Sequence, residues 1–180
     1  MFLNYLFVFF AFLVDAALNI TFPVRFAFDG MYFVPCIGLC SMVLSVRKMD
    51  HINAILMILL FGMGYDFFYA NTPFFYTIIF LLIYGIVYVW GKIVNESIIE
   101  SLVLCISTVF TKELMVYLFM IMGGYTNIGF HTFLTNRLFL TIVVNAVFVF
   151  ILILLAYIKD DIQKQREVRI RKEERLPWLH

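Results

Sequence analysis

Charged residues are scarce in this sequence: they make up 14% of its 180 residues, against about 25% in an ordinary soluble domain. Hydrophobic residues make up 64%, and the mean hydropathy is +0.98. A soluble fold of this size leaves much of its surface in water, so it has no interior large enough for so many apolar side chains. The composition therefore excludes an ordinary soluble domain and indicates a protein whose solvent is the lipid bilayer.

Cysteine is also rare, and three cysteines do not form the even set that is typical of a disulfide framework. Cys36 and Cys40 would share a helical face, but no histidine or carboxylate follows at metal-ligand spacing, so we expect packing residues. The sequence contains no Ser-His-Asp set, no phosphate-binding glycine loop and no HExxH motif. Asp15 and Asp66 lie at different depths, which disfavours an aspartyl protease dyad. We therefore predict no enzyme, no metal site and no cofactor.

Long apolar runs are what the sequence has in quantity, and several approach the roughly 20 residues that a membrane-spanning helix needs. The predicted spans are Leu3–Phe22, Met31–Val46, Ile52–Phe68, Phe74–Val94, Ile98–Met122 and Leu138–Ile158. Met31–Val46 is the weakest, because it is short and contains Pro35 and Gly38. We expect the first run to remain as a span, since no basic segment precedes it. The predicted fold class is an all-α integral membrane protein, a bundle of six transmembrane helices with five as the alternative.

The distribution of charge predicts the domain organisation and the orientation. Residues 1–158 would form the transmembrane bundle, residues 159–180 a charged cytoplasmic tail, and the longest connection would run from Gly123 to Arg137. With six spans, both termini and ten of the 13 basic residues lie on one side, which the positive-inside rule places in the cytoplasm. Those ten are Arg47, Lys48, Lys92, Lys159, Lys164, Arg166, Arg169, Arg171, Lys172 and Arg175.

The tail carries five acidic residues among its seven basic ones. This mixture is not the dense basic run of a nucleic-acid-binding arm, so we predict no nucleic acid partner. A solvated helical extension and a contact with anionic membrane lipids both remain open for the tail.

Ionisable and amide side chains inside the predicted spans are costly in lipid and are the candidate functional residues. At helical rise, Asp15 and Asn145 lie about 10 Å inside the outer ends of their spans. Lys112 and Glu113 lie about 15 Å inside, whereas Asp66 is only about 3 Å from an end and is expected to be solvated. We expect Lys112 to pair with Asp15, because an unpaired charge at that depth costs several kcal/mol. Glu113 would be protonated or bonded to Asn145. An interhelical polar clamp and a transport or ligand-binding site both remain open.

The region of the third predicted span carries a local pattern. It reads Gly62-Met63-Gly64-Tyr65-Asp66-Phe67-Phe68-Tyr69-Ala70-Asn71-Thr72-Pro73 and continues into a long apolar helix. A glycine-containing apolar helix, an aspartate four residues later and a turn with proline resemble the rod shape-determining MreD family. Gly62, Asp66 and Pro73 match the motif, which covers residues 62 to about 91. Family members often have a glycine where this chain has Ala70 and Asn71. The length, the five to six spans and the charged tail also agree with the resemblance.

The resemblance implies a multi-pass subunit of the bacterial cell-elongation machinery in the cytoplasmic (inner) membrane, with no catalytic activity. It implies the single-span protein MreC as a direct partner. MreB, a peptidoglycan glycosyltransferase and a class B penicillin-binding protein would be indirect partners. It also implies a fold similar to the substrate-binding subunits of energy-coupling-factor transporters. The alternative hypothesis is that the chain is itself a small-molecule-binding subunit of such a transporter, with its ligand near Asp15, Lys112 and Glu113.

Overall fold

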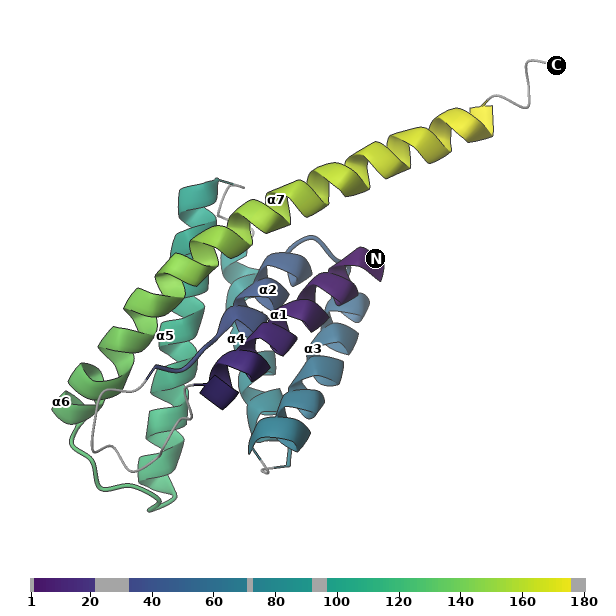
Figure 1. Cartoon of the computed structure of the whole chain (residues 1–180). Coiled ribbons are helices and arrows are strands. Elements are labelled where there is room, and N and C mark those ends of the chain that lie inside the picture. Colours follow the sequence, from purple (N-terminus) through teal and green to yellow (C-terminus); the bar gives the residue numbers. More distant parts are fainter. Residues whose placement is uncertain (1, 22–32, 71–72, 92–96, 176–180) are drawn as a thin grey trace.

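The computed structural model describes residues 2–21, 33–70, 73–91 and 97–175, and every regular element in these ranges is helical (Figure 1). The elements are α1 (Phe2–Thr21), α2 (Ile37–Val46), α3 (His51–Tyr65), the π-helical turn η1 (Asp66–Ala70), α4 (Phe75–Gly91), α5 (Ile98–Met122), α6 (Phe130–Phe133), the π-helical turn η2 (Leu134–Leu138) and α7 (Phe139–Arg175). Helices are expected for so apolar a chain, because a helix satisfies its own backbone polar groups in lipid. The prediction of an all-α fold is confirmed for these residues.

Four of the described helices are long and apolar enough to cross a membrane. They are Phe2–Thr21, His51–Phe68, Ile98–Met122 and Phe130–Arg171, while Ile37–Val46 and Phe75–Trp90 are shorter apolar helices. Long apolar helices in this number are compatible with a multi-pass membrane protein.

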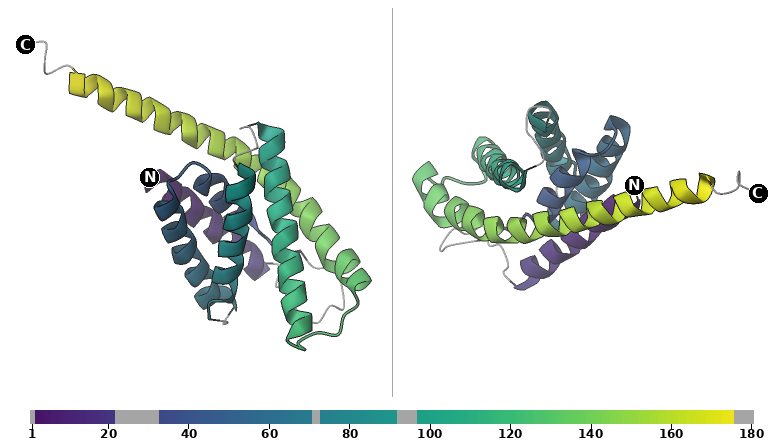
Figure 2. Two further views of the ribbon diagram at one scale, coloured as in Figure 1. Left: turned by 180° about the vertical axis from the view of Figure 1, so that it is seen from behind. Right: turned by 90° about the horizontal axis from the view of Figure 1, so that it is seen from above.

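The short helix α2 occupies the centre of the bundle. It contacts α1, α3, α4, α5 and α7 (Figure 2), and all ten of its residues are buried. Residues 33–36 lead into it without regular structure. The prediction of one span over Met31–Val46 is wrong in its start, because the helix begins only at Ile37. Pro35 explains the difference: it lacks an N–H and holds the residue before it in an extended conformation.

Helix α5 begins and ends with local signals in the sequence. Ser97 caps its first turn, with the Glu100 N–H donating to Ser97 Oγ at 3.2 Å. After the helix, Gly124 has a φ of 69°, a left-handed conformation that favours glycine. The Tyr125 N–H then donates to the Met120 carbonyl at 2.9 Å, which satisfies one of the last helical acceptors.

The last helical stretch starts earlier than predicted and continues into the tail, for which a helical extension is one of the two expectations. Helix begins at Phe130, passes through η2 and continues as α7 to Arg175, so the second half of the predicted loop from Gly123 to Arg137 is helical. The 37 residues of α7 measure about 55 Å, more than the roughly 30 Å hydrocarbon core of a bilayer. The helix crosses the predicted domain boundary at residue 158 without a break and projects beyond the other helices (Figure 1).

Several predicted features fall outside the described residues. They are residues 22–32 with Arg25, which include the start of Met31–Val46, residues 71–72 of the MreD-like motif, residues 92–96 with Lys92, and the chain end at residues 176–180.

Candidate functional site

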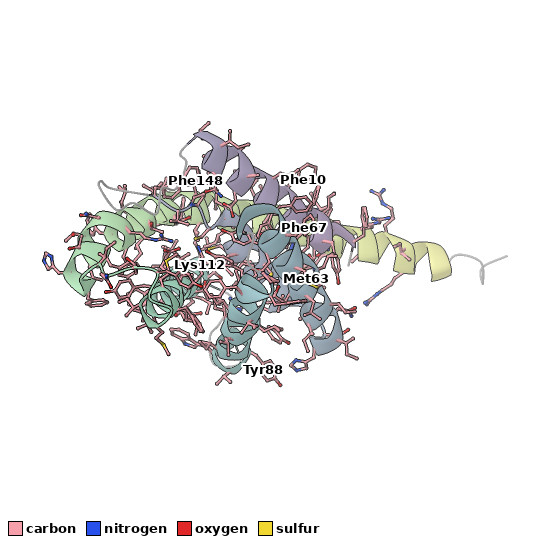
Figure 3. The ribbon with its side chains drawn as sticks, turned by 90° about the horizontal axis from the view of Figure 1, so that it is seen from below. Phe10, Met63, Phe67, Tyr88, Lys112 and Phe148 are labelled. Atoms are coloured by element: carbon pink, nitrogen blue, oxygen red, sulfur yellow. The ribbon has the colours of Figure 1, made fainter. Side chains whose placement is uncertain are left out.

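A layer of buried polar side chains crosses the bundle at the level where α2 begins. We call it the polar layer; it consists of Asp15, Lys112, Glu113, Arg137, Thr141 and Asn145, each at most 4% exposed. The side chains come from α1, α5, η2 and α7 and surround residues 34–38. Figure 3 shows Lys112 lying between the helices and Tyr88 at the outer edge of the bundle, and Phe10 and Phe67 are exposed. Two carboxylates and two cations make the formal charge of the layer zero.

Three of the charged groups form a triad around Glu113. Lys112 Nζ donates to Glu113 Oε1 and Arg137 Nε donates to Glu113 Oε2, both at 2.7 Å. Lys112 Nζ also lies 3.5 Å from Cys36 Sγ and 5.8 Å from the centre of the Tyr76 ring. Each oxygen of the carboxylate therefore holds one cation, which is the arrangement that a buried ion pair requires to offset its desolvation.

The Asp15 carboxylate caps the first turn of α2. The backbone N–H groups of Ile37 and Gly38 donate to its two oxygens at 2.8 and 2.7 Å. The first N–H groups of a helix have no partner within the helix, and the positive end of the helix dipole favours a negative group there. Asp15 thereby ties α1 to the start of a helix that lies inside the protein.

Asn145 and Thr141 satisfy the non-helical backbone before α2. Asn145 Oδ1 accepts from the Cys36 N–H at 2.9 Å, and Asn145 Nδ2 donates to the Val34 carbonyl at 2.8 Å. Thr141 Oγ1 accepts from the Val34 N–H at 3.2 Å. Irregular backbone is tolerated at membrane depth only where protein groups satisfy it, and these two side chains of α7 do so.

The predicted pairings of the polar residues are wrong, although the residues themselves lie together. The predicted pair of Lys112 with Asp15 does not form: Lys112 pairs with its neighbour Glu113, and the Asp15 oxygens accept from the first two backbone N–H groups of α2. Asn145 bonds backbone groups and not Glu113. Both oxygens of each carboxylate accept a hydrogen bond, Asp15 from backbone N–H groups and Glu113 from two cations. The sequence alone does not show which of these groups lie close together.

Arg137 and Thr141 are members of the layer that the sequence analysis missed. The sequence predicts Arg137 at the end of the connection from Gly123, whereas it is 4% exposed and its guanidinium pairs with Glu113. A signal was present: Arg137, Thr141 and Asn145 are spaced by four residues, which puts them on one face of a helix. The predicted last span begins at Leu138, one residue after Arg137, so the prediction leaves Arg137 outside the helix that carries Thr141 and Asn145.

A second polar contact joins α3 to α4 through the residues of the MreD-like motif. Asp66 accepts from the N–H groups of Tyr76 and Thr77 at 2.7 and 2.9 Å, and from Thr77 Oγ1 at 2.7 Å. The expectation that Asp66 is solvated is wrong, since it is 4% exposed; it caps the first turn of α4. Pro73 lies exposed in the turn just before this helix.

Gly62 lets the same two helices approach closely. A Cβ atom built on Gly62 would lie 3.0 Å from Thr77 Cα, whereas one on Gly64 meets nothing within 4 Å. Gly62 and Asp66 therefore both act on Thr77, one by contact and one by hydrogen bonds.

We expect Gly62→Ala to lower the free energy of unfolding in detergent by about 1–3 kcal/mol, because the added methyl group presses on the backbone of α4. Gly64→Ala is the matched control in the same helix, and we expect it to be neutral or to stabilise by up to about 1 kcal/mol through helix propensity. Thermal unfolding of the two variants measures the difference. Equal melting temperatures would contradict the close-contact interpretation.

The arrangement of these groups favours a structural clamp. Each charged group of the polar layer is bonded to another member or to backbone. No grouping of three potential metal ligands occurs among the described residues, and Cys36, Cys40 and Cys105 are buried free thiols.

No protein-family model, no curated protein and no solved structure matches this chain.

Proposed function

We propose that this chain is a non-catalytic scaffold subunit of the bacterial cell-elongation complex, similar to MreD, which binds MreC in the inner membrane and supports lateral peptidoglycan synthesis and cell shape. The observation that supports it best is the convergence of Gly62 and Asp66 on Thr77. The residues that carry the resemblance thus build one structural unit, the hairpin of α3 and α4. The scaffold would be a six-helix bundle, with both termini in the cytoplasm.

The polar layer supports a scaffold role because it stabilises the bundle from within. Its hydrogen bonds connect α1 and α7 to the backbone around the start of α2, and they connect η2 to α5. A bundle held in this way can offer its outer faces to other helices. Helices α1 and α3 leave most of their residues on the outside, so a partner's span can pack on them through van der Waals contact.

Co-purification tests this proposal. A tagged chain extracted from its native membrane should retain a single-span MreC-like protein. A photo-cross-linking residue at Phe10 or Met63, which are 56% and 48% exposed, should capture that protein. The same residue at Phe80, which is 1% exposed, should not. The proposal fails if no MreC-like protein is retained and none is captured from any exposed position of α1 or α3.

A second candidate function is a small-molecule-binding subunit of an energy-coupling-factor type transporter. The observation that favours it is the buried N-terminus of α2, which follows the non-helical residues 33–36, because transporters often place a helix N-terminus inside the membrane to face an anionic substrate. Here the Asp15 carboxylate already occupies that position. Co-purification of an ATPase pair in place of MreC, or neighbouring genes that encode ATPases, would favour this function.

A further inference from the structure

A small cavity lies at the end of the bundle where α2 ends, α5 begins and α7 projects outward. Its volume is about 20 Å³, which exceeds the roughly 10–15 Å³ needed for one water-sized group. It is lined by Leu44, Arg47, Lys48, Ser101, Ile153, Ala156, Tyr157 and Asp160. These residues come from α2 and the two residues after it, from α5 and from α7, so only the folded bundle brings them together.

The lining divides into an apolar floor and a polar rim. Leu44, Ile153 and Ala156 form the floor, each at most 8% exposed. The rim carries Arg47, Lys48 and Asp160, and the buried Ser101 hydroxyl in the first turn of α5 completes the polar lining. A cavity with this division has the polarity of the boundary between hydrocarbon and headgroups.

The sequence changes from apolar to charged at this same level. Apolar α2 ends at Val46 and is followed by Arg47 and Lys48, and apolar α7 gives way to Lys159 and Asp160 after Ile158. The cavity therefore lies where a phospholipid phosphate would lie if these helices cross a bilayer.

Ionic contacts hold Lys48 and Asp160 in position at the cavity. Lys48 Nζ pairs with Asp160 Oδ2, and Lys159 Nζ lies 3.3 Å from Asp160 Oδ1 and donates to Asn4 Oδ1 at 2.8 Å. The charged residues that line the cavity are two cations, Arg47 and Lys48, and one carboxylate, Asp160, so the formal charge of the lining is +1. The excess charge favours an anion.

An apolar stripe on α7 leads away from the cavity. Phe150, Leu154 and Tyr157 follow one another at intervals of four and three residues and are 48%, 41% and 39% exposed. This spacing places them on one helical face, and Tyr157 also lines the cavity. The stripe provides the contact that an acyl chain requires below its headgroup.

We propose that this cavity binds the phosphate of an anionic phospholipid. One phosphate oxygen enters the cavity between the cations and Ser101, the phosphorus remains at the mouth, and an acyl chain packs along Phe150, Leu154 and Tyr157. The site requires both parts of the lipid, because the cations attract any phosphate but only a lipid contacts the stripe.

Thermal unfolding of the full chain in detergent tests the proposal, with phosphatidylglycerol, phosphatidylcholine or inorganic phosphate added. We expect phosphatidylglycerol to raise Tm at concentrations where phosphatidylcholine and inorganic phosphate leave it unchanged. In Arg47→Gln/Lys48→Gln, the half-maximal phosphatidylglycerol concentration should rise about 30-fold, from roughly 1 kcal/mol per cation. Arg166→Gln/Arg169→Gln removes the same charge from exposed positions of α7 and should stay within about twofold of the parent.

A second variant covers the case in which Arg47→Gln/Lys48→Gln does not fold. Ser101→Leu fills the cavity without a change in charge and should weaken the phosphatidylglycerol effect by a similar factor. Equal stabilisation by both lipids, stabilisation by inorganic phosphate alone, or an equal loss in the Arg166→Gln/Arg169→Gln control would each overturn the proposal.

Discussion

Glu113→Gln is expected to lower the free energy of unfolding in detergent by about 3–5 kcal/mol. Glu113 is fully buried and its two oxygens accept from Lys112 and Arg137. The substitution keeps the size of the side chain but removes the charge that both cations share, and its amide group faces one of them as a donor. Two buried cations would then have no adjacent counter-charge, which is the situation that makes a broken buried ion pair costly.

Glu100→Gln is the matched control for this prediction, because it is the same chemical change on the same helix at a half-buried position. We expect it to change stability by less than about 1 kcal/mol. In the double variant Glu113→Gln/Arg137→Gln, one unpaired cation is removed, so part of the stability should return. Thermal unfolding compares all three variants. Equal melting temperatures for Glu113→Gln and Glu100→Gln would contradict the triad.

Asp15→Leu is expected to destabilise the protein by about 2–6 kcal/mol, since the N–H groups of Ile37 and Gly38 would each lose their acceptor at about 1–3 kcal/mol. Asp15→Asn keeps one acceptor oxygen, so its effect should be smaller. Hydrogen exchange provides a local measurement: Asp15→Leu should accelerate exchange at the start of α2.

Asp66→Leu is the control for Asp15→Leu, because Asp66 caps a different helix with the same chemistry. It should accelerate exchange at the start of α4 and leave α2 unchanged. If both variants accelerated exchange in α2 equally, the assignment of Asp15 as the specific cap of that helix would be wrong.

The local features of the fold could be read from the sequence because they depend on nearby residues. The apolar runs predicted helices, and four of those described are long enough to cross a membrane. The MreD-like pattern placed Gly62, Asp66 and Pro73 around one turn, and the first two meet on Thr77. Residues on the two helices of a hairpin lie close together because the connection between them is short, and this does not depend on how the other helices pack.

The centre of the bundle could not be read in the same way. Its short length and Pro35 make Met31–Val46 the weakest predicted span, yet α2 contacts five other helices and all its residues are buried. A helix surrounded by protein has no need to match the thickness of a bilayer, so hydropathy and length underestimate its role. Arg137 was missed for a related reason, since the helical face it belongs to begins before the apolar run does.

The sequence by itself determined which residues are costly to place in lipid, because that cost depends on the chemistry of each side chain and on its position in an apolar run. Only the tertiary structure decided their partners. Asp15 meets the N–H groups of α2, Asn145 meets the extended backbone before it, and Glu113 meets Arg137. These contacts depend on how each helix is rotated about its axis and how closely it approaches α2. The packing of all the helices together sets that rotation, so it cannot be derived from the sequence of any one segment.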